Sequence, residues 1–108
     1  MNTRVYRPTP SNLQRLAAVL RRGDLVAVPT ETVYGLAGDA TNSEACHKIF
    51  KAKERPTNDP LIVHVHRLAQ AKALTTWNEA ADTLARRFWP GPLTMILPKS
   101  EGVLDIVT

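Results

Sequence analysis

The chain has 108 residues, which is enough for one small domain and excludes a large multidomain enzyme. Hydrophobic residues make up 44% and charged residues 22% of it, as is ordinary for a globular protein, and an aromatic share of 6% predicts a mostly aliphatic core. The net charge of +4 and the pI near 9.6 favour anionic partners such as nucleotides or RNA. A basic surface that serves only solubility would have the same balance.

The single cysteine, Cys46, bears on the compartment and on nucleophilic chemistry. One cysteine cannot form an internal disulfide, so we expect a reducing cytoplasm. Cys46 lies in an expected helix beside Ile49 and Phe50, and we interpret it as a core thiol rather than a nucleophile. The first ten residues lack a signal-like apolar run, and no apolar stretch is long enough to span a membrane, so we expect no membrane association.

The first half of the chain predicts two helices that flank a short strand. Ser11 is expected to cap a helix that carries Leu13, Leu16, Ala17 and Leu20 on one face and that ends at Gly23. Residues 25–28 read as a buried strand ended by Pro29, and residues 30–41 as a loop. A second helix is expected to start at Asn42 or Ser43 and to run to about Lys53, with Ala45, Ile49 and Ala52 facing inward.

The second half predicts two more strands and two more helices. Strands are expected at 61–65 and 93–97, and helices at 67–75 and after the capping residue Asn78, with a sharp turn at 89–92. The alternation indicates an α/β or α+β domain, a twisted open sheet flanked by helices. The apolar residues of 100–108 resemble the start of another packed element, so we expect the sheet to be incomplete at the C-terminus and 1–108 to be the N-terminal portion of one domain.

Basic residues gather where the second helix must end. Lys48, Lys51, Lys53 and Arg55 place four cations in eight residues, directly before Pro56. A run of this kind often forms only a solvated helix face. However, Lys53 and Arg55 extend from a backbone that proline restrains, and an arginine fork next to a lysine suits phosphate binding.

Hydroxyl groups follow the expected strand 25–28, and imidazole groups lie within and just after the expected strand 61–65. Thr30, Thr32 and Tyr34 alternate along the strand exit and are able to line a cleft for a small polar ligand, or simply to pack a loop. His64 and His66 lie on one face of the expected strand 61–65. No nearby side chain clearly supplies a third metal ligand, so we interpret His64 as a polar group at a cleft edge or a satisfied core histidine.

Four blocks of sequence in order resemble the YrdC-like family of L-threonylcarbamoyladenylate synthases. They read PTETVYGL at 29–36, IFKAKERP at 49–56, PLIVHV at 60–65 and WPGPLT at 89–94. The resemblance extends through residues 11–98. It implies a twisted α/β sheet with a concave, positively charged groove, and an enzyme, a nucleotidyltransferase, that joins L-threonine, bicarbonate and ATP into threonylcarbamoyl-AMP and releases pyrophosphate. The product is used for N6-threonylcarbamoyladenosine at tRNA position 37, with transfer made by separate downstream proteins.

The resemblance also implies roles for individual residues. Lys53 and Arg55 match the Lys-x-Arg pair that contacts ATP phosphates, which would arrive with Mg²⁺. Thr32 and His64 match positions that hold threonine, and Thr30 and Tyr34 line the same pocket by proximity. Two further residues are expected near the nucleotide. Asp59 stands where the family often has asparagine, and an acid there would either repel phosphate or help to hold magnesium, while Asn58 is able to take over the neutral contact.

One departure and three alternatives accompany this interpretation. The family signature ends in a Ser-x-Asn motif beyond a strand that carries an arginine, and this chain has neither, so the chain alone is expected to bind weakly or to need the absent segment. The first alternative is a module that binds tRNA or double-stranded RNA without synthase activity. The second is a relative that acts on another carbamoyl substrate, as in hydrogenase maturation, and the third is an inactive fragment.

Overall fold

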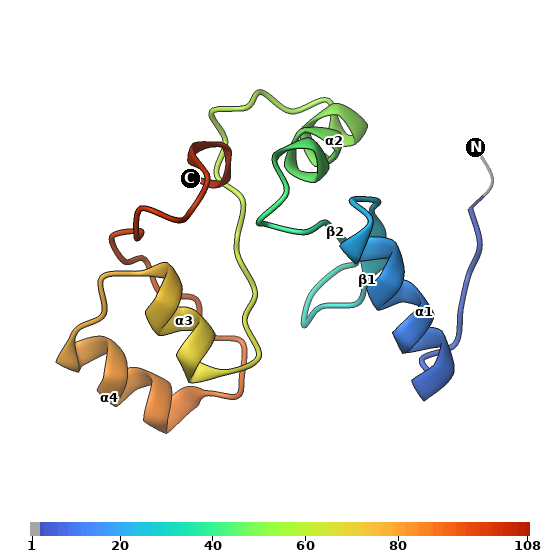
Figure 1. Cartoon of the computed structure of the whole chain (residues 1–108). Helices are drawn as coiled ribbons and strands as arrows, with labels where there is room; N and C mark the ends of the chain where they lie inside the picture. The colour runs from blue at the N-terminus through green and yellow to red at the C-terminus, as the bar shows by residue number, and fades with distance from the viewer. Residues whose placement is uncertain (1–2) are drawn as a thin grey trace. The chain divides into compact units, whose positions relative to one another are not determined.

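The structure is a computed structural model that describes residues 3–108 (Figure 1). It divides into two compact units, which meet in the sequence at Thr57 and Asn58. The first unit contains α1, β1, β2 and α2, and the second contains α3, α4 and the short 3-10 helix η1. In the part of the chain that the structure describes, no helix is both long and apolar enough to cross a membrane.

Helix α1, Pro10–Arg21, has its N-terminal cap two residues earlier than predicted. Thr9 is the N-cap, and its hydroxyl accepts a hydrogen bond from the Asn12 N–H at 3.2 Å. The prediction of Ser11 as the cap is therefore wrong. Proline is favoured in the first turn because it lacks the N–H that would go unpaired there, so Pro10 extends the helix rather than preceding it.

The apolar face of α1 is only partly covered. Leu16, Ala17 and Leu20 are half-buried, whereas Leu13 remains 53% exposed, so the expected face is confirmed over its second half. Gly23 follows the helix with a φ of 89°, which confirms the predicted left-handed glycine. The glycine is buried and turns the chain toward β1.

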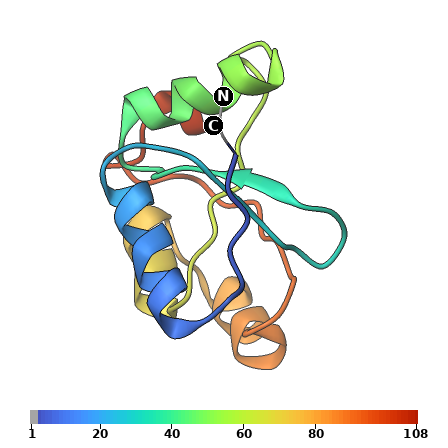
Figure 2. The same ribbon diagram turned by 90° about the vertical axis from the view of Figure 1, so that its right-hand side faces the viewer.

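A hairpin follows this turn. Strand β1, Val26–Val28, confirms the predicted strand, and it pairs antiparallel with β2, Gly35–Ala37, with Ala27 opposite Leu36. Strand β2 was predicted as loop, because three residues that begin with glycine give too short a pattern to show alternation. Residues 29–34 connect the strands as an extended loop, drawn in teal in Figure 2.

Helix α2, Ser43–Lys53, supplies most of the buried side chains of the first unit. Asn42 caps it by accepting from the N–H groups of Glu44 and Ala45 at 3.0 and 3.2 Å, as predicted. Its buried residues are Ala45, Cys46, Ile49 and Phe50, which confirms Cys46 as a core thiol. Ala52 is exposed instead of facing inward, because the helix is close to its end at that point.

The second unit has both of its predicted helices. They are α3, Leu68–Leu74, and α4, Glu79–Phe88, and the Asn78 side chain caps α4 by accepting from the Ala81 N–H at 2.8 Å. The backbone N–H of Ser100 donates to the carbonyl of Leu74, which ties the end of α3 to the chain after residue 98. Helix η1, Asp105–Val107, closes the unit with Val107 fully buried.

The strands predicted at 61–65 and 93–97 are wrong as hydrogen-bonded elements. Both segments are extended, and Figure 1 draws 58–66 as a long trace without an arrow before α3. The half-buried residues of 93–97 alternate with exposed ones, and Ile96 is 98% exposed. The apolar alternation therefore corresponds to an extended backbone. A hydrogen-bonded strand also needs a neighbouring strand to pair with. Within residues 58–108 the structure records only the isolated bridge between Thr75 and Lys99.

The predicted α+β class is confirmed, because residues 3–108 form a two-stranded antiparallel sheet and four α-helices. The core is mostly aliphatic, as the low aromatic content predicted. Among residues 3–108, Phe50 is its one buried aromatic residue, and alanines make up four of the eight buried hydrophobic residues.

Candidate functional site

The end of α2 holds the two cations that the sequence assigned to phosphate. Lys53 is the last residue of the helix, and Glu54 follows it in the left-handed conformation, with φ 53° and ψ 40°. The N–H of Glu54 donates to the carbonyl of Lys51 at 3.3 Å, and the N–H of Arg55 donates to that of Phe50 at 3.0 Å. These two bonds form the Schellman arrangement, which ends a helix sharply and turns the chain away from its axis. Lys53 and Arg55 thus extend from either side of one fixed turn.

A shallow depression of about 580 Å³ lies along α2 and reaches this turn. Arg55 lines it, whereas Lys53 does not. The other lining residues include charges of both signs and the buried Phe50. They are Glu44, His47, Lys48, Phe50, Lys51, Glu54 and Thr57. The depression is open to solvent and is not an enclosed cavity.

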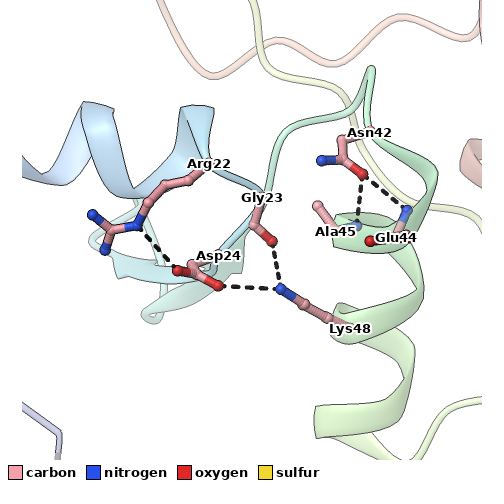
Figure 3. Close-up of polar contacts among 7 residues, drawn as sticks. All are labelled: Arg22, Gly23, Asp24, Asn42, Glu44, Ala45 and Lys48. Atoms are coloured by element: carbon pink, nitrogen blue, oxygen red, sulfur yellow. Dashed lines mark hydrogen bonds and ion pairs between the residues drawn. The ribbon is translucent and has the colours of Figure 1, made fainter.

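The cations of α2 differ in what they already contact. Figure 3 shows that the Lys48 ammonium donates to the carbonyl of Gly23 at 3.0 Å and to the carboxylate of Asp24 at 3.1 Å. The same carboxylate accepts from Arg22, and these two cations hold the pKa of Asp24 below its usual range. Lys48 therefore ties α2 to the turn after α1. Within residues 3–108 neither Lys53 nor Arg55 has a carboxylate partner, so both cations are available to an anion.

The threonines of the β1–β2 loop bond to one another. The Thr30 hydroxyl donates to the carbonyl of Val33 and accepts from the N–H of Thr32 at 3.3 Å, and the two threonine hydroxyl oxygens lie 3.4 Å apart. Thr30 therefore uses its own proton to shape the loop, and Thr32 presents the freer hydroxyl. Tyr34 is 77% exposed. The structure brings Thr30 and Thr32 together, and Tyr34 stands at the surface of its unit.

The remaining predicted residues lie in the second unit. His64 is exposed, and its Nδ1 is 3.2 Å from the carbonyl oxygen of Ile62. Asn58 is exposed and Asp59 half-buried. His66 is held differently from His64, because both its N–H and its Nδ1 bond to the Gln70 side chain at the start of α3. Within residues 3–108, no three His, Cys, Asp or Glu side chains gather in a way that could hold a metal ion.

Two further observations concern residues whose role the sequence left open or missed. Burial, helped by the negative charge of Asp39, raises the pKa of the Cys46 thiol, which keeps it protonated and unsuited to attack. The left-handed backbone of Glu54 was missed. Its signal was present: α2 has to end before Pro56, and no glycine stands there to end it.

A family model described as "Telomere recombination", Sua5/YciO/YrdC, matches residues 18–108. The chain belongs to this family. Relatives named threonylcarbamoyl-AMP synthase include one from Pyrococcus abyssi, 50% identical over 85% of this chain, and one from Bacillus subtilis, 52% identical over 86%. The chain spans 27% of the length of each of these relatives.

Solved structures agree with this assignment. The crystal structure of P. abyssi Sua5 complexed with L-threonine matches 95% of this chain with a TM-score of 0.89 and 46% identity. The match covers 31% of that longer chain. A double-alanine variant of the same protein, H234A/Y235A, matches with the same TM-score over 94% of this chain. The family assignment therefore rests on both sequence and backbone.

Proposed function

We propose that this chain is the part of an L-threonylcarbamoyladenylate synthase that carries its Lys-x-Arg phosphate contact and its first threonine-binding residues. The observation that carries the proposal is the match of 95% of the chain, at 46% identity and a TM-score of 0.89, to a family member complexed with L-threonine. Relatives about 50% identical named for this activity support the same reaction. The enzyme class that follows is a nucleotidyltransferase.

The proposed reaction needs positioning and charge balance rather than a covalent nucleophile. The threonine amine adds to carbon dioxide derived from bicarbonate and loses a proton, which gives a carbamate. A carbamate oxygen then attacks the α-phosphorus of ATP; the new O–P bond forms as the bond to the β-phosphate oxygen breaks, and pyrophosphate leaves with the electron pair. In steps of this kind a protein accelerates the reaction mainly by orientation and electrostatic stabilisation.

Lys53 and Arg55 are assigned to the triphosphate. Both lack a carboxylate partner among the described residues, and the Schellman turn restrains the backbone between them. The substrate would be Mg·ATP, since Mg²⁺ is commonly bound through substrate phosphates and one or two carboxylates rather than by a protein cage. Asp59, half-buried near the start of the second unit, is the acid that the sequence places closest to this role, and Asn58 beside it offers a neutral contact.

Threonine is assigned to Thr32 and His64. The backbone N–H of Thr32 donates to the Thr30 hydroxyl, which holds Thr32 within the loop and leaves its hydroxyl the freer of the two. His64 is exposed and so is accessible to a ligand. Tyr34, exposed in the same loop as Thr32, would cover the ligand from the rim.

The wider setting follows from the product. A threonylcarbamoyl adenylate is an activated acyl donor, so proteins that transfer the group to adenosine 37 of tRNA would act next. The net charge of +4 is compatible with tRNA approaching the protein. A cytoplasmic location agrees with this use and with the single, free and buried cysteine.

The deciding experiment is pyrophosphate release from ATP by this chain, with threonine and bicarbonate omitted in turn. We expect weak release from this chain, because the Ser-x-Asn segment is absent from it, and we expect that release to require both substrates. Lys53→Ala with Arg55→Ala should abolish the release, because losing such contacts costs on the order of 2–4 kcal/mol of transition-state stabilisation. Arg21→Ala, which removes an exposed arginine from the end of α1, is the matched control and should retain activity.

Three results would count against the proposal or its residue assignment. Release that is indifferent to threonine, or equal release from the double variant, would overturn the residue assignment. RNA binding that falls steeply with salt, together with no release from a folded sample, would instead indicate a binding module.

A further inference from the structure

Glu54 has a backbone conformation that residues with a side chain rarely adopt. Its φ of 53° is left-handed, and within residues 3–108 it is the one residue other than glycine with a positive φ. Left-handed backbone at a residue with a Cβ is unfavourable, and it persists at functional sites where the surroundings enforce it. Glu54 lies between Lys53 and Arg55, so the strained residue joins the two cations that the proposed function assigns to phosphate.

The surroundings explain why the strain persists. Arg55 precedes Pro56, and the proline ring disfavours helical backbone at the residue before it, so α2 has to end here. The left-handed Glu54 allows the N–H of Arg55 to reach the carbonyl of Phe50 at 3.0 Å. Phe50 is 3% exposed and belongs to the core. The backbone of Arg55 is thus bonded to a core residue on one side and restrained by proline on the other.

We propose that Glu54 is a positioning residue: its left-handed backbone, rather than its carboxylate, directs Arg55 to the phosphates of ATP. This inference rests on the proposed function. The Glu54 side chain is exposed and forms no ion pair among the described residues, so its charge has no evident structural task. It follows that any residue able to adopt the left-handed region should serve, and that a residue unable to do so should weaken ATP binding even when the protein folds.

The test is a calorimetric titration of Mg·ATP into the full chain and its variants. Glu54→Val should bind Mg·ATP about tenfold more weakly, because a branched Cβ makes the left-handed backbone at this position less favourable. Glu54→Gly, which loses the same charge without that cost, should bind within about twofold of wild type. The affinity of Glu54→Ala should fall between those of the valine and glycine variants. The alanine variant replaces the valine variant in the test if the latter does not fold. Glu79→Val, the same substitution in the first turn of α4, should leave the affinity unchanged.

The outcomes separate this inference from the proposed function. Wild-type chain that shows no ATP binding overturns the proposed function, and this inference with it. Wild-type binding with equal affinities for the valine, alanine and glycine variants, each shown to be folded by circular dichroism, overturns this inference alone. Equal weakening in all three variants would assign the effect to the carboxylate and would also overturn it.

Discussion

Thr30 shows how one hydroxyl group organises the loop between β1 and β2. Its oxygen accepts from the Thr32 N–H at 3.3 Å while its proton goes to the Val33 carbonyl. Threonine in such turns satisfies backbone groups that have no strand partner. From the sequence, Thr30 and Thr32 alternate along a strand exit and were expected either to line one cleft or to pack a loop. In the structure their hydroxyl oxygens lie 3.4 Å apart within the loop.

The Thr30 bonds predict a local change in exchange with solvent. Thr30→Val keeps the shape of the side chain and removes the acceptor for the Thr32 N–H. A hydrogen bond of this kind contributes about 1 kcal/mol, so exchange of the Thr32 amide should rise about fivefold. Thr30→Ser should restore slow exchange. Hydrogen exchange followed by nuclear magnetic resonance would measure it, and an unchanged Thr32 rate in the valine variant would contradict the proposed loop structure.

Among the structural elements, the turn between α1 and β1 depends on a single glycine. Gly23 has a φ of 89°, and a Cβ at this position would lie 2.8 Å from the side-chain nitrogen of Asn42, the N-cap of α2. Lys48 of α2 also donates to the Gly23 carbonyl, as Figure 3 shows. The end of one helix and the start of another therefore meet at this turn.

This crowding predicts a loss of stability when a methyl group is added. Gly23→Ala imposes a left-handed backbone on alanine and displaces the Asn42 cap, so the free energy of unfolding should fall by about 1–3 kcal/mol. Gly102→Ala is the control, because a Cβ there meets nothing within 4 Å. Urea unfolding of both variants would measure the difference, and equal midpoints would show that the turn tolerates a side chain.

Helices were predictable from the sequence to a degree that strands were not. Asn78 was recognised as a cap, and the start of α2 was narrowed to Asn42 or Ser43, because capping depends on a few neighbouring residues. The same local reasoning predicted the left-handed Gly23. The segments 61–65 and 93–97 carried the apolar alternation of strands, but pairing is decided by a partner elsewhere in the chain. The candidate site divides in the same way: the cations at the end of α2 were found, whereas the left-handed Glu54 between them was not.

Across the whole molecule, both units carry carboxylates whose pKa is lowered by cations. In the first unit Asp24 lies 3.1 Å from Lys48 and 3.3 Å from Arg22. In the second unit Asp82 accepts from Arg86 at 2.6 Å and from the indole of Trp77 at 3.3 Å, and Asp105 pairs with Lys99. Each partner stabilises the ionised carboxylate, which lowers the pKa of all three groups below their usual range.

These shifts predict that acid destabilises both units. Because the folded pKa values lie below those of the unfolded chain, the unfolded state binds more protons at acid pH, and stability falls as the pH drops below about 4. The contribution is present in full above that range and is lost as the pH passes through the folded pKa values. The pairs are exposed, so salt should reduce the effect.

Urea unfolding between about pH 6 and about pH 3 would measure this acid dependence. Replacing Asp24, Asp82 and Asp105 together by asparagine should flatten the curve, since the variant no longer has these protons to gain. Glu101→Gln, which removes an exposed carboxylate without an ion pair among the described residues, should leave the curve as in wild type. An equally steep acid loss in the triple variant would place the responsible groups elsewhere. Single variants then assign the loss to one unit or the other, because Asp24 belongs to the first and the other two aspartates to the second.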